Sequence, residues 1–258
     1  MSNQMVFKRY ELKYMLTRRQ RDIIREAMSA YMIADEHGRK TILSLYLDTP
    51  DYLLIRRSID KPVYKEKLRL RSYDVADKDT EVFIELKKKY NSVVYKRREG
   101  MTERELEQYL TDKIVPKDTQ IMHEIDFAMK RYPSLSPAVM LSYEREAFYS
   151  KDDHDFRMTF DENILWRTDD LSLCSSVHGT PLLDSNQVLL EVKTTGAIPL
   201  WLVRILSQEN IRKTSFSKYG TAYQTILANN QNRLPRRESM PIEHTTTQTL
   251  NGGNYKYA

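Results

Sequence analysis

The chain has 258 residues, of which 40% are hydrophobic and 30% are charged, so it is long enough to bury a core of its own. Its 41 basic and 36 acidic residues leave a net charge of +5, which is modest for a general nucleic-acid binder. The single cysteine, Cys174, excludes an internal disulfide and a cysteine-based zinc site. The longest apolar run, Ile198 to Leu206, contains Arg204 and is too short to span a bilayer, so we expect a cytoplasmic protein.

Several segments alternate between charged and apolar side chains, as strands with one wet face and one buried face do. The first runs from Phe7 to Tyr14, and Thr17 is then expected to cap a helix over residues 17–32. The second runs from Lys40 to Asp48 and is ended by the Thr-Pro pair at Pro50.

The next segment, from Val63 to Tyr73, is the most unusual in the chain. Leu68 and Leu70 lie on one face, and the other face carries four cations: Lys65, Lys67, Arg69 and Arg71. Four like charges on one strand repel each other. The arrangement is therefore tolerable only against bulk solvent or against a concentrated negative charge.

A hairpin is expected over residues 81–99, turning at Asn91. Its first arm places three charged residues on one face: Glu85, Lys87 and Lys89. In the returning arm the pair Tyr95 and Arg97 opposes the pair Lys96 and Arg98, and the pattern leaves open which pair points inward.

The rest of the chain adds helices and three more strands. A capping box of Thr102 and Glu105 predicts a helix there, and a second helix ends before Pro133. The later strands, the helix that follows them and a short loop before the last helix cover residues 137–150, 156–166, 187–196, 199–211 and 215–218. We interpret residues 1–230 as one domain and 231–258 as a flexible polar tail, because the tail has no apolar period.

Alternation alone assigns many charged side chains to one shared interior. Its cations are Lys13, Lys65, Lys67, Arg69, Arg71, Lys87, Lys89, Arg145, Arg157 and Lys193. Its acids are Glu11, Glu85 and Glu191. Because burying an unpaired charge is costly, this interior must be wet and must hold an anionic ligand, most economically a chain of phosphates. The acids are then candidate ligands of a divalent metal that bridges phosphate oxygens.

Simpler interpretations exist for each piece. Any one of these strands, taken alone, is more often a half-exposed strand with a solvated charged face. The histidines show no metal-ligand spacing, and the chain lacks a glycine-rich phosphate loop. Nucleic acid is not an expected partner, because the interior interleaves few stacking aromatics with its cations.

The ordered motifs resemble a known family. They are RYELKY near the N-terminus, YLDT at Tyr46–Thr49, KLRLRSY at Lys67–Tyr73, FIELKKK at Phe83–Lys89, YER at Tyr143–Arg145, RMTFD at Arg157–Asp161, LEVK at Leu190–Lys193 and SFSKY at Ser215–Tyr219. This set resembles the VTC domain, the catalytic domain of the vacuolar transporter chaperone polyphosphate polymerase. That domain belongs to the triphosphate tunnel metalloenzyme (CYTH-like) superfamily, and the resemblance covers residues 7–229.

The resemblance implies an α+β fold in which an eight-stranded antiparallel β-barrel, with a cationic interior and flanking helices, forms a tunnel. It implies that Mn²⁺ or Mg²⁺ and the triphosphate of ATP bind inside, and that the terminal phosphate is transferred to a polyphosphate chain. The residues implied to act on phosphate are Lys13, Arg69, Arg71, Lys87, Arg145, Arg157 and Lys218. Further substrate-binding candidates are Lys67, Lys89, Lys193, Ser217 and Tyr46, and the metal candidates are Glu191, Glu85 and Glu11.

One departure concerns the paired glutamates that are typical of hydrolytic members of the superfamily. Glu11 and Lys13 remain, but Arg9 occupies the first glutamate position, which favours the polymerase branch. The alternatives are a triphosphatase of inorganic or nucleoside triphosphates and a non-catalytic polyphosphate-binding module. The membrane domains of the eukaryotic complex are absent from this chain, so coupling to translocation would need a separate membrane partner, which the basic tail could contact.

Overall fold

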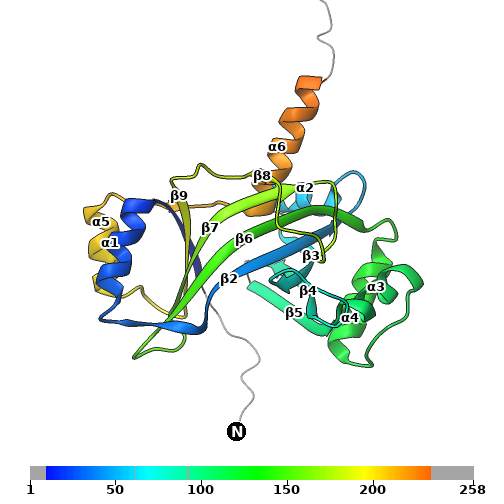
Figure 1. Ribbon diagram of the computed structural model, residues 1–258, viewed down its shortest axis with the longest axis horizontal. Coiled ribbons are helices and arrows are strands. Elements are labelled where there is room, and N and C mark those ends of the chain that lie inside the picture. The colour runs from blue at the N-terminus through cyan, green and yellow to red at the C-terminus, as the bar shows by residue number, and fades with distance from the viewer. Residues whose placement is uncertain (1–9, 61, 92, 234–258) are drawn as a thin grey trace, which may run out of the picture.

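Ten antiparallel strands in one sheet organise the computed structural model, which describes residues 10–60, 62–91 and 93–233 (Figure 1). The strands are β1 (Tyr10–Thr17), β2 (Met32–Asp48), β3 (Tyr64–Tyr73), β4 (Glu81–Tyr90), β5 (Val93–Thr102), β6 (Ser136–Ser150), β7 (Arg157–Arg167), β8 (Thr180–Pro181), β9 (Gln187–Thr194) and β10 (Lys213–Thr214). Their hydrogen-bonded order is β10-β1-β9-β7-β6-β2-β3-β4-β5, and β8 pairs with β7 beside this path.

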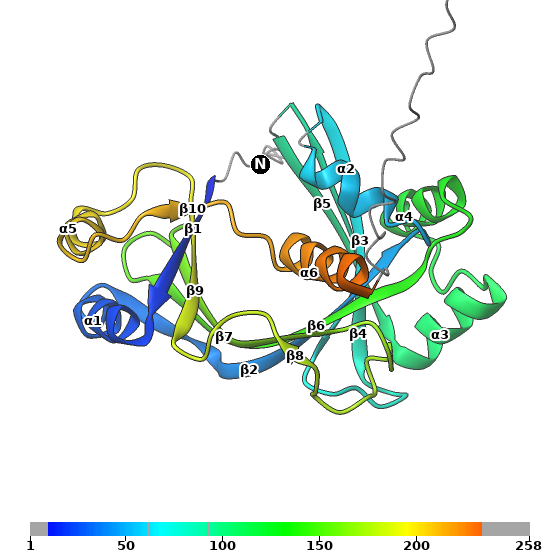
Figure 2. The ribbon, with the colours of Figure 1, turned by 90° about the horizontal axis from the view of Figure 1, so that it is seen from above.

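Over the described residues, the sheet is curved and does not close. Its outermost strands, β10 and β5, do not pair with each other among the described residues, so the predicted closed barrel of eight strands is not found. Figure 2 shows a trough with β1 and β9 in one arm and β3, β4 and β5 in the other. Side-chain alternation reports the face on which a residue lies, but it does not report whether the outermost strands hydrogen-bond to each other.

The described residues form six helices beside the sheet: α1 (Arg18–Met28), α2 (Leu53–Ile59), α3 (Glu103–Asp112), α4 (Gln120–Arg131), α5 (Leu200–Gln208) and α6 (Lys218–Arg233). The capping boxes at Thr17 and Thr102 are formed, and the second confirms the predicted pairing with Glu105. Among the described helices, none is both long enough and apolar enough to span a membrane.

Two apolar cores cover the convex side of the sheet, one on each arm (Figure 1). On one arm, α1 and α5 place Ile24 and Leu202 against Phe160 of β7. On the other, α3 and α4 bury Met122 against Leu86 of β4. Each fully buried side chain of this size contributes about 1.5–3 kcal/mol. The alternation predicted from sequence therefore orients the apolar faces outward, toward the helices.

The last helix, α6, packs on the opposite, concave side, between the two arms (Figure 2). Tyr219 and Tyr223 lie in a third apolar cluster with Leu141 of β6 and Leu189 of β9. The Tyr219 hydroxyl donates to Asp48 Oδ2 at 2.8 Å, and the same carboxylate accepts the backbone amides of Leu54 and Ile55 in the first turn of α2. The predicted polar interior is therefore apolar where α6 packs, because the last helix supplies a lining that strand alternation alone does not reveal.

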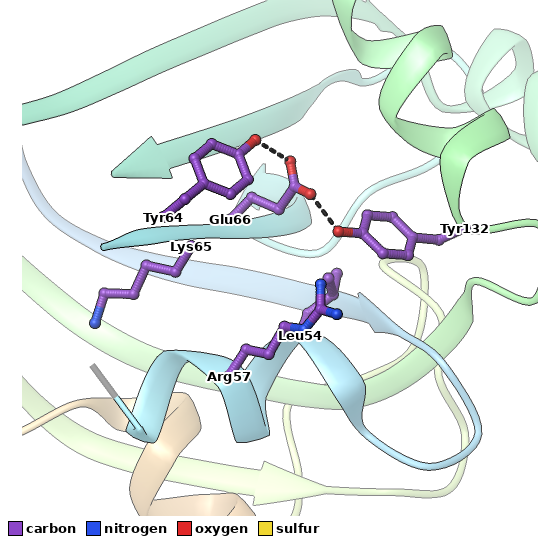
Figure 3. Close-up of a pocket in the computed structure, with 6 residues that line it drawn as sticks. All are labelled: Leu54, Arg57, Tyr64, Lys65, Glu66 and Tyr132. Atoms are coloured by element: carbon purple, nitrogen blue, oxygen red, sulfur yellow. Dashed lines mark hydrogen bonds between the residues drawn. The ribbon is translucent and has the colours of Figure 1, made fainter. Parts of the chain in front are cut away.

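A buried carboxylate on the convex side joins β3 to the end of α4 (Figure 3). Glu66 accepts hydrogen bonds from the hydroxyls of Tyr132 at 2.5 Å and Tyr64 at 2.8 Å. Burial and this hydrogen bond raise the pKa of Tyr64 to about 12. Leu54 and Arg57 of α2 line a small cavity beside Glu66. This cavity lies where α2 packs against β3.

Candidate active site on the concave face

The strand register brings the predicted interior residues to one face. Residues directly opposite each other in neighbouring strands point to the same side of a sheet. Lys67 lies opposite Lys87, and Arg69 lies opposite Glu85. The same register continues into β5, where the inward pair is Lys96 and Arg98, which settles the choice that the sequence pattern left open.

An acid-paired cluster of five residues occupies the arm of β6, β7, β9 and β1: Lys13, Arg145, Asp161, Glu191 and Lys218. Arg145 binds both Asp161 oxygens, from Nε at 2.5 Å and Nη2 at 2.6 Å, and its Nη2 also lies 3.2 Å from Glu191. Lys218, the first residue of α6, contacts Asp161 and lies 3.3 Å from Glu191 Oε1. Lys13 Nζ is 3.2 Å from the same oxygen.

The charges in this cluster stabilise one another. Burial by itself would raise the carboxyl pKa values, but Lys218 and Arg145 outweigh it and hold the pKa of Glu191 well below its usual range. Arg145 and Lys218 lower the pKa of Asp161 in the same way. Both cations also lie over the ring of Tyr143, at 5.2 Å and 4.5 Å from its centroid. Asp161 and Glu191 therefore remain ionised near neutral pH.

Glu11 connects the two arms across the trough. Its carboxylate lies 3.4 Å from Lys13 on its own strand and 3.8 Å from Lys87 on β4. Burial opposes its ionisation, but Lys87 and other lysines lower its pKa. Side chains of the two arms thus meet even though the backbones of β1 and β5 are not paired.

The β3–β4–β5 arm carries a second group, here called the lysine arm, which consists of Lys65, Lys67, Arg69, Glu85, Lys87, Lys89, Lys96 and Arg98. Its buried acid is Glu85, which lies 2.5 Å from Arg69, 2.7 Å from Lys96 and 3.7 Å from Arg98. Despite its burial, Arg69 and neighbouring cations lower the pKa of Glu85 to about 2. This carboxylate is surrounded by cations of its own arm and shows no contact with Glu191 among the described residues.

Lys67 is a cation of the lysine arm that other cations surround. It forms no ion pair within the described part of the chain. Burial, together with Lys87, Lys65 and Lys13, lowers its pKa to about 8. The pKa of Tyr46 on the neighbouring β2 is lowered as well. Burial opposes ionisation of its hydroxyl, but Arg69 and Lys67 lower the pKa to about 8.

The other predicted residues lie at different depths of the concave face. Arg71 is 7% exposed, and its Nη2 donates to the Tyr143 hydroxyl at 3.1 Å. Arg157 shares the register row of Lys193 but is exposed at the start of β7, where its Nε donates to the His154 carbonyl. Ser217 precedes α6, and its Oγ accepts the amide of Gly220 at 3.2 Å.

Sequence reasoning did not assign Asp161 or Tyr143 to the site, and it left open whether Lys96 and Arg98 face inward. Asp161 lies four residues after Arg157 and therefore on the same face of β7, and that spacing was the available signal. Its ion pairs with Arg145 and Lys218 come from β6 and α6, so the sequence spacing could not reveal them.

The neighbours of each carboxylate decide whether it fits as a ligand of a divalent metal. No group of three or more metal-ligating side chains forms among the described residues. Glu11 and Glu191 nevertheless both contact Lys13 Nζ, at 3.4 Å and 3.2 Å, so a cationic atom already lies between two carboxylates. Mg²⁺ is commonly bound by one or two carboxylates plus substrate phosphates and water, and this pair fits that pattern. Glu85 fits this pattern of metal binding less well, because Arg69, Lys96 and Arg98 already surround its carboxylate.

The fold resembles that of solved structures. One is a candidate adenylate cyclase from Bacillus halodurans, with a TM-score of 0.51 and 14% identity over 80% of this chain and 92% of that chain. Two others give TM-scores below 0.5: a candidate adenylate cyclase from Vibrio parahaemolyticus (0.44, 14% identity, 87% and 99% covered) and a protein from Pyrococcus horikoshii OT3 (0.41, 13%, 86% and 99%). At this identity the likeness shows the fold alone.

Comparison by sequence identifies the family. No curated protein matches the chain. The profile of the VTC domain family matches residues 8–227, which include every residue of the acid-paired cluster and of the lysine arm. The chain therefore belongs to the VTC domain family.

Proposed function

We propose that this protein is a metal-dependent phosphotransferase that synthesises polyphosphate from ATP on its concave face. The observation that carries the proposal is the lysine arm, whose cations outnumber its one buried acid, Glu85. Such an excess of positive charge suits a polyanion that spans several phosphate groups. The VTC family membership supports the same substrate class.

Arginines, lysines and glutamates of the concave face would have different roles in phosphate binding. Arg69 and Arg71 offer planar guanidinium groups, which suit bidentate contact with phosphate oxygens, and Lys67 and Lys87 supply point charges beside them. Glu11 and Glu191 would hold a Mg²⁺ or Mn²⁺ ion, whose charge would offset that of the phosphates. This chemistry needs no covalent nucleophile, since positioning and electrostatic stabilisation suffice for phosphoryl transfer.

The acid-paired cluster would serve as an internal counterion system. Without substrate, Asp161 and Glu191 neutralise Arg145, Lys218 and Lys13. An entering phosphate chain brings its own negative charge, so these cations can turn toward it while the carboxylates remain available for the metal. The cations are thereby held ionised and in place before substrate arrives.

Hydrolysis of inorganic or nucleoside triphosphates is the second candidate. It needs the same cations with water as the acceptor, and the retained Glu11 beside Glu191 favours it, because two carboxylates suit metal-assisted attack by water. A module that binds polyphosphate without turnover would need the cations but neither carboxylate. A separate membrane partner, which would couple synthesis to translocation, remains part of the polymerase proposal.

Incubation of the full chain with ATP and Mn²⁺ separates these functions. Products are run on a gel stained for polyphosphate while free phosphate is assayed in parallel, and the same reaction is repeated with Mg²⁺ and with a chelator. A ladder of long chains that requires the metal supports the polymerase. Free phosphate without a ladder contradicts it in favour of hydrolysis, and tight polyphosphate binding with neither product favours the binding module.

A further inference from the structure

An aromatic group lies on the concave face, at the end of β3 and β4 opposite from Lys65 and Lys89. We call it the aromatic shelf, and it consists of Tyr73, Phe83 and Arg98. The rings of Tyr73 and Phe83 meet edge to face with centroids 5.9 Å apart. The Arg98 guanidinium lies 3.5 Å from the centroid of Phe83, and its Nη2 donates to the Tyr73 hydroxyl at 3.2 Å.

The shelf is built closely but remains accessible. Gly100 lies opposite Phe83, and a Cβ at that position would come within 3.1 Å of the Phe83 ring and 2.9 Å of Glu81 Oε1. A larger residue would therefore displace the ring. Tyr73 is 41% exposed, so one edge of the shelf faces outward. The buried Nε of Arg98 has no hydrogen-bond partner among the described residues and lies 3.7 Å from Glu85 Oε1, so Glu85 holds the guanidinium against the Phe83 ring.

The shelf adjoins the proposed phosphate ligands. Arg71 precedes Tyr73 by two residues on the same face of β3, a separation of roughly 7 Å along a strand. Arg98 also lies 3.7 Å from Glu85, which binds Arg69 at 2.5 Å. A flat group on the shelf and a phosphate at Arg69 or Arg71 are therefore close enough to belong to one ligand.

We propose that Tyr73, Phe83 and Arg98 form a nucleobase subsite, on which the base of ATP stacks while its triphosphate extends toward Arg71 and Arg69. Aromatic rings and arginine guanidinium planes both stack on bases, and every base offers a π-face to them. The inference rests on triphosphate binding by the concave face and adds to it a reason for choosing a nucleoside triphosphate over inorganic triphosphate.

The test compares two ligands that differ in the base and ribose. Binding of inorganic tripolyphosphate and of the non-hydrolysable β,γ-imido analogue of ATP is measured by calorimetry with the full chain in Mg²⁺. Tyr73→Ala is expected to weaken binding of the ATP analogue about tenfold, the scale of losing one stacking partner, and to change tripolyphosphate binding less than about twofold. Tyr73→Phe, which keeps the ring, should bind both ligands as the wild type does.

Tyr90→Ala is the matched control, because this tyrosine is 52% exposed on the convex side of β4. Equal weakening of both ligands by Tyr73→Ala would overturn the inference and indicate a general effect on the concave face. No change for either ligand would overturn it as well. A wild-type chain that binds neither ligand would contradict the proposed function itself, whereas wild-type tripolyphosphate binding with an unaffected Tyr73→Ala variant would contradict the subsite alone.

Discussion

The two arms of the sheet present cations to the same concave face, but they neutralise them differently. On the arm that meets α6, Arg145 and Lys218 are shared between Asp161 and Glu191. On the lysine arm, Glu85 is the buried acid among seven cations, and Lys67 has no acidic partner among the described residues. The first arm is therefore built to hold its charges in place, and the second is built to attract negative charge from outside.

This difference predicts that stability depends on the first arm and that ligand affinity depends on the second. A buried ion pair is weak evidence of net stabilisation, but removal of one partner leaves an uncompensated charge that is costly. An uncompensated lysine lowers stability in the absence of ligand and strengthens the binding of phosphate. Variants on the two arms test this difference, and their expected effects are given from the largest to the smallest.

Asp161→Asn should destabilise the protein by about 3–5 kcal/mol, because Arg145 and Lys218 would lose the buried charge that they share. Chemical denaturation followed by fluorescence measures the free energy of unfolding. Asp22→Asn is the control: Asp22 pairs with Arg21 at 2.7 Å, but its side chain is 63% exposed, so the change should cost about 1 kcal/mol or less. Equal costs for the two variants would contradict the structural role of this cluster.

Glu191→Gln should lower turnover of ATP by about 100-fold or more, the scale of losing one electrostatic group from an active site, and should leave tripolyphosphate binding largely intact. Glu85→Gln provides the comparison on the other arm, since it also lies among three cations. Its expected effect on turnover is smaller, because Glu85 does not adjoin Glu11. Steady-state rates and calorimetry separate the two effects. Full activity of Glu191→Gln would remove its assignment as a metal ligand.

Arg69→Ala and Arg71→Ala should each weaken tripolyphosphate binding by about tenfold at low salt, because each removes a charge-assisted hydrogen-bond donor. The loss should shrink as salt screens the remaining charges. Lys88→Ala, on the convex side where Lys88 pairs with Glu124, should bind as the wild type does. A titration series at several salt concentrations measures this, and unchanged affinity in both arginine variants would place the ligand elsewhere.

Phosphate affinity should fall several-fold as the pH rises through about 8. Lys67 loses its proton in that range, which removes an attraction for phosphate, and Tyr46 gains a negative charge in the same range, which repels phosphate. Lys67→Arg should make the profile shallower between pH 7 and 9, because only the contribution of Tyr46 is left, and a profile that keeps its full slope in this variant would exclude Lys67 as a cause. Because burial lowers the folded-state pKa of Lys67, its ammonium costs stability at neutral pH, and that cost disappears between about 8 and the unfolded value.

Much of the candidate site was predictable because strand alternation is a local property. The cations of β3 and β4 lie on one face for the same reason that Leu68 and Leu70 lie on the other. The family resemblance added Lys218, which the alternation of strands could not reach because it begins a helix. Arg157 was also placed on the correct face, but its exposure at the strand start could not be read from spacing.

By itself, the sequence determined which side chains share a face, because neighbouring residues of an extended chain must point in opposite directions. The tertiary structure decided which of those charges meet. In the described part of the chain, it left the sheet open between β10 and β5, placed α6 on the concave side, and joined Asp161 to Arg145 and Lys218. These outcomes depend on curvature, register and helix docking between segments far apart in the chain, and no local periodicity encodes such distances.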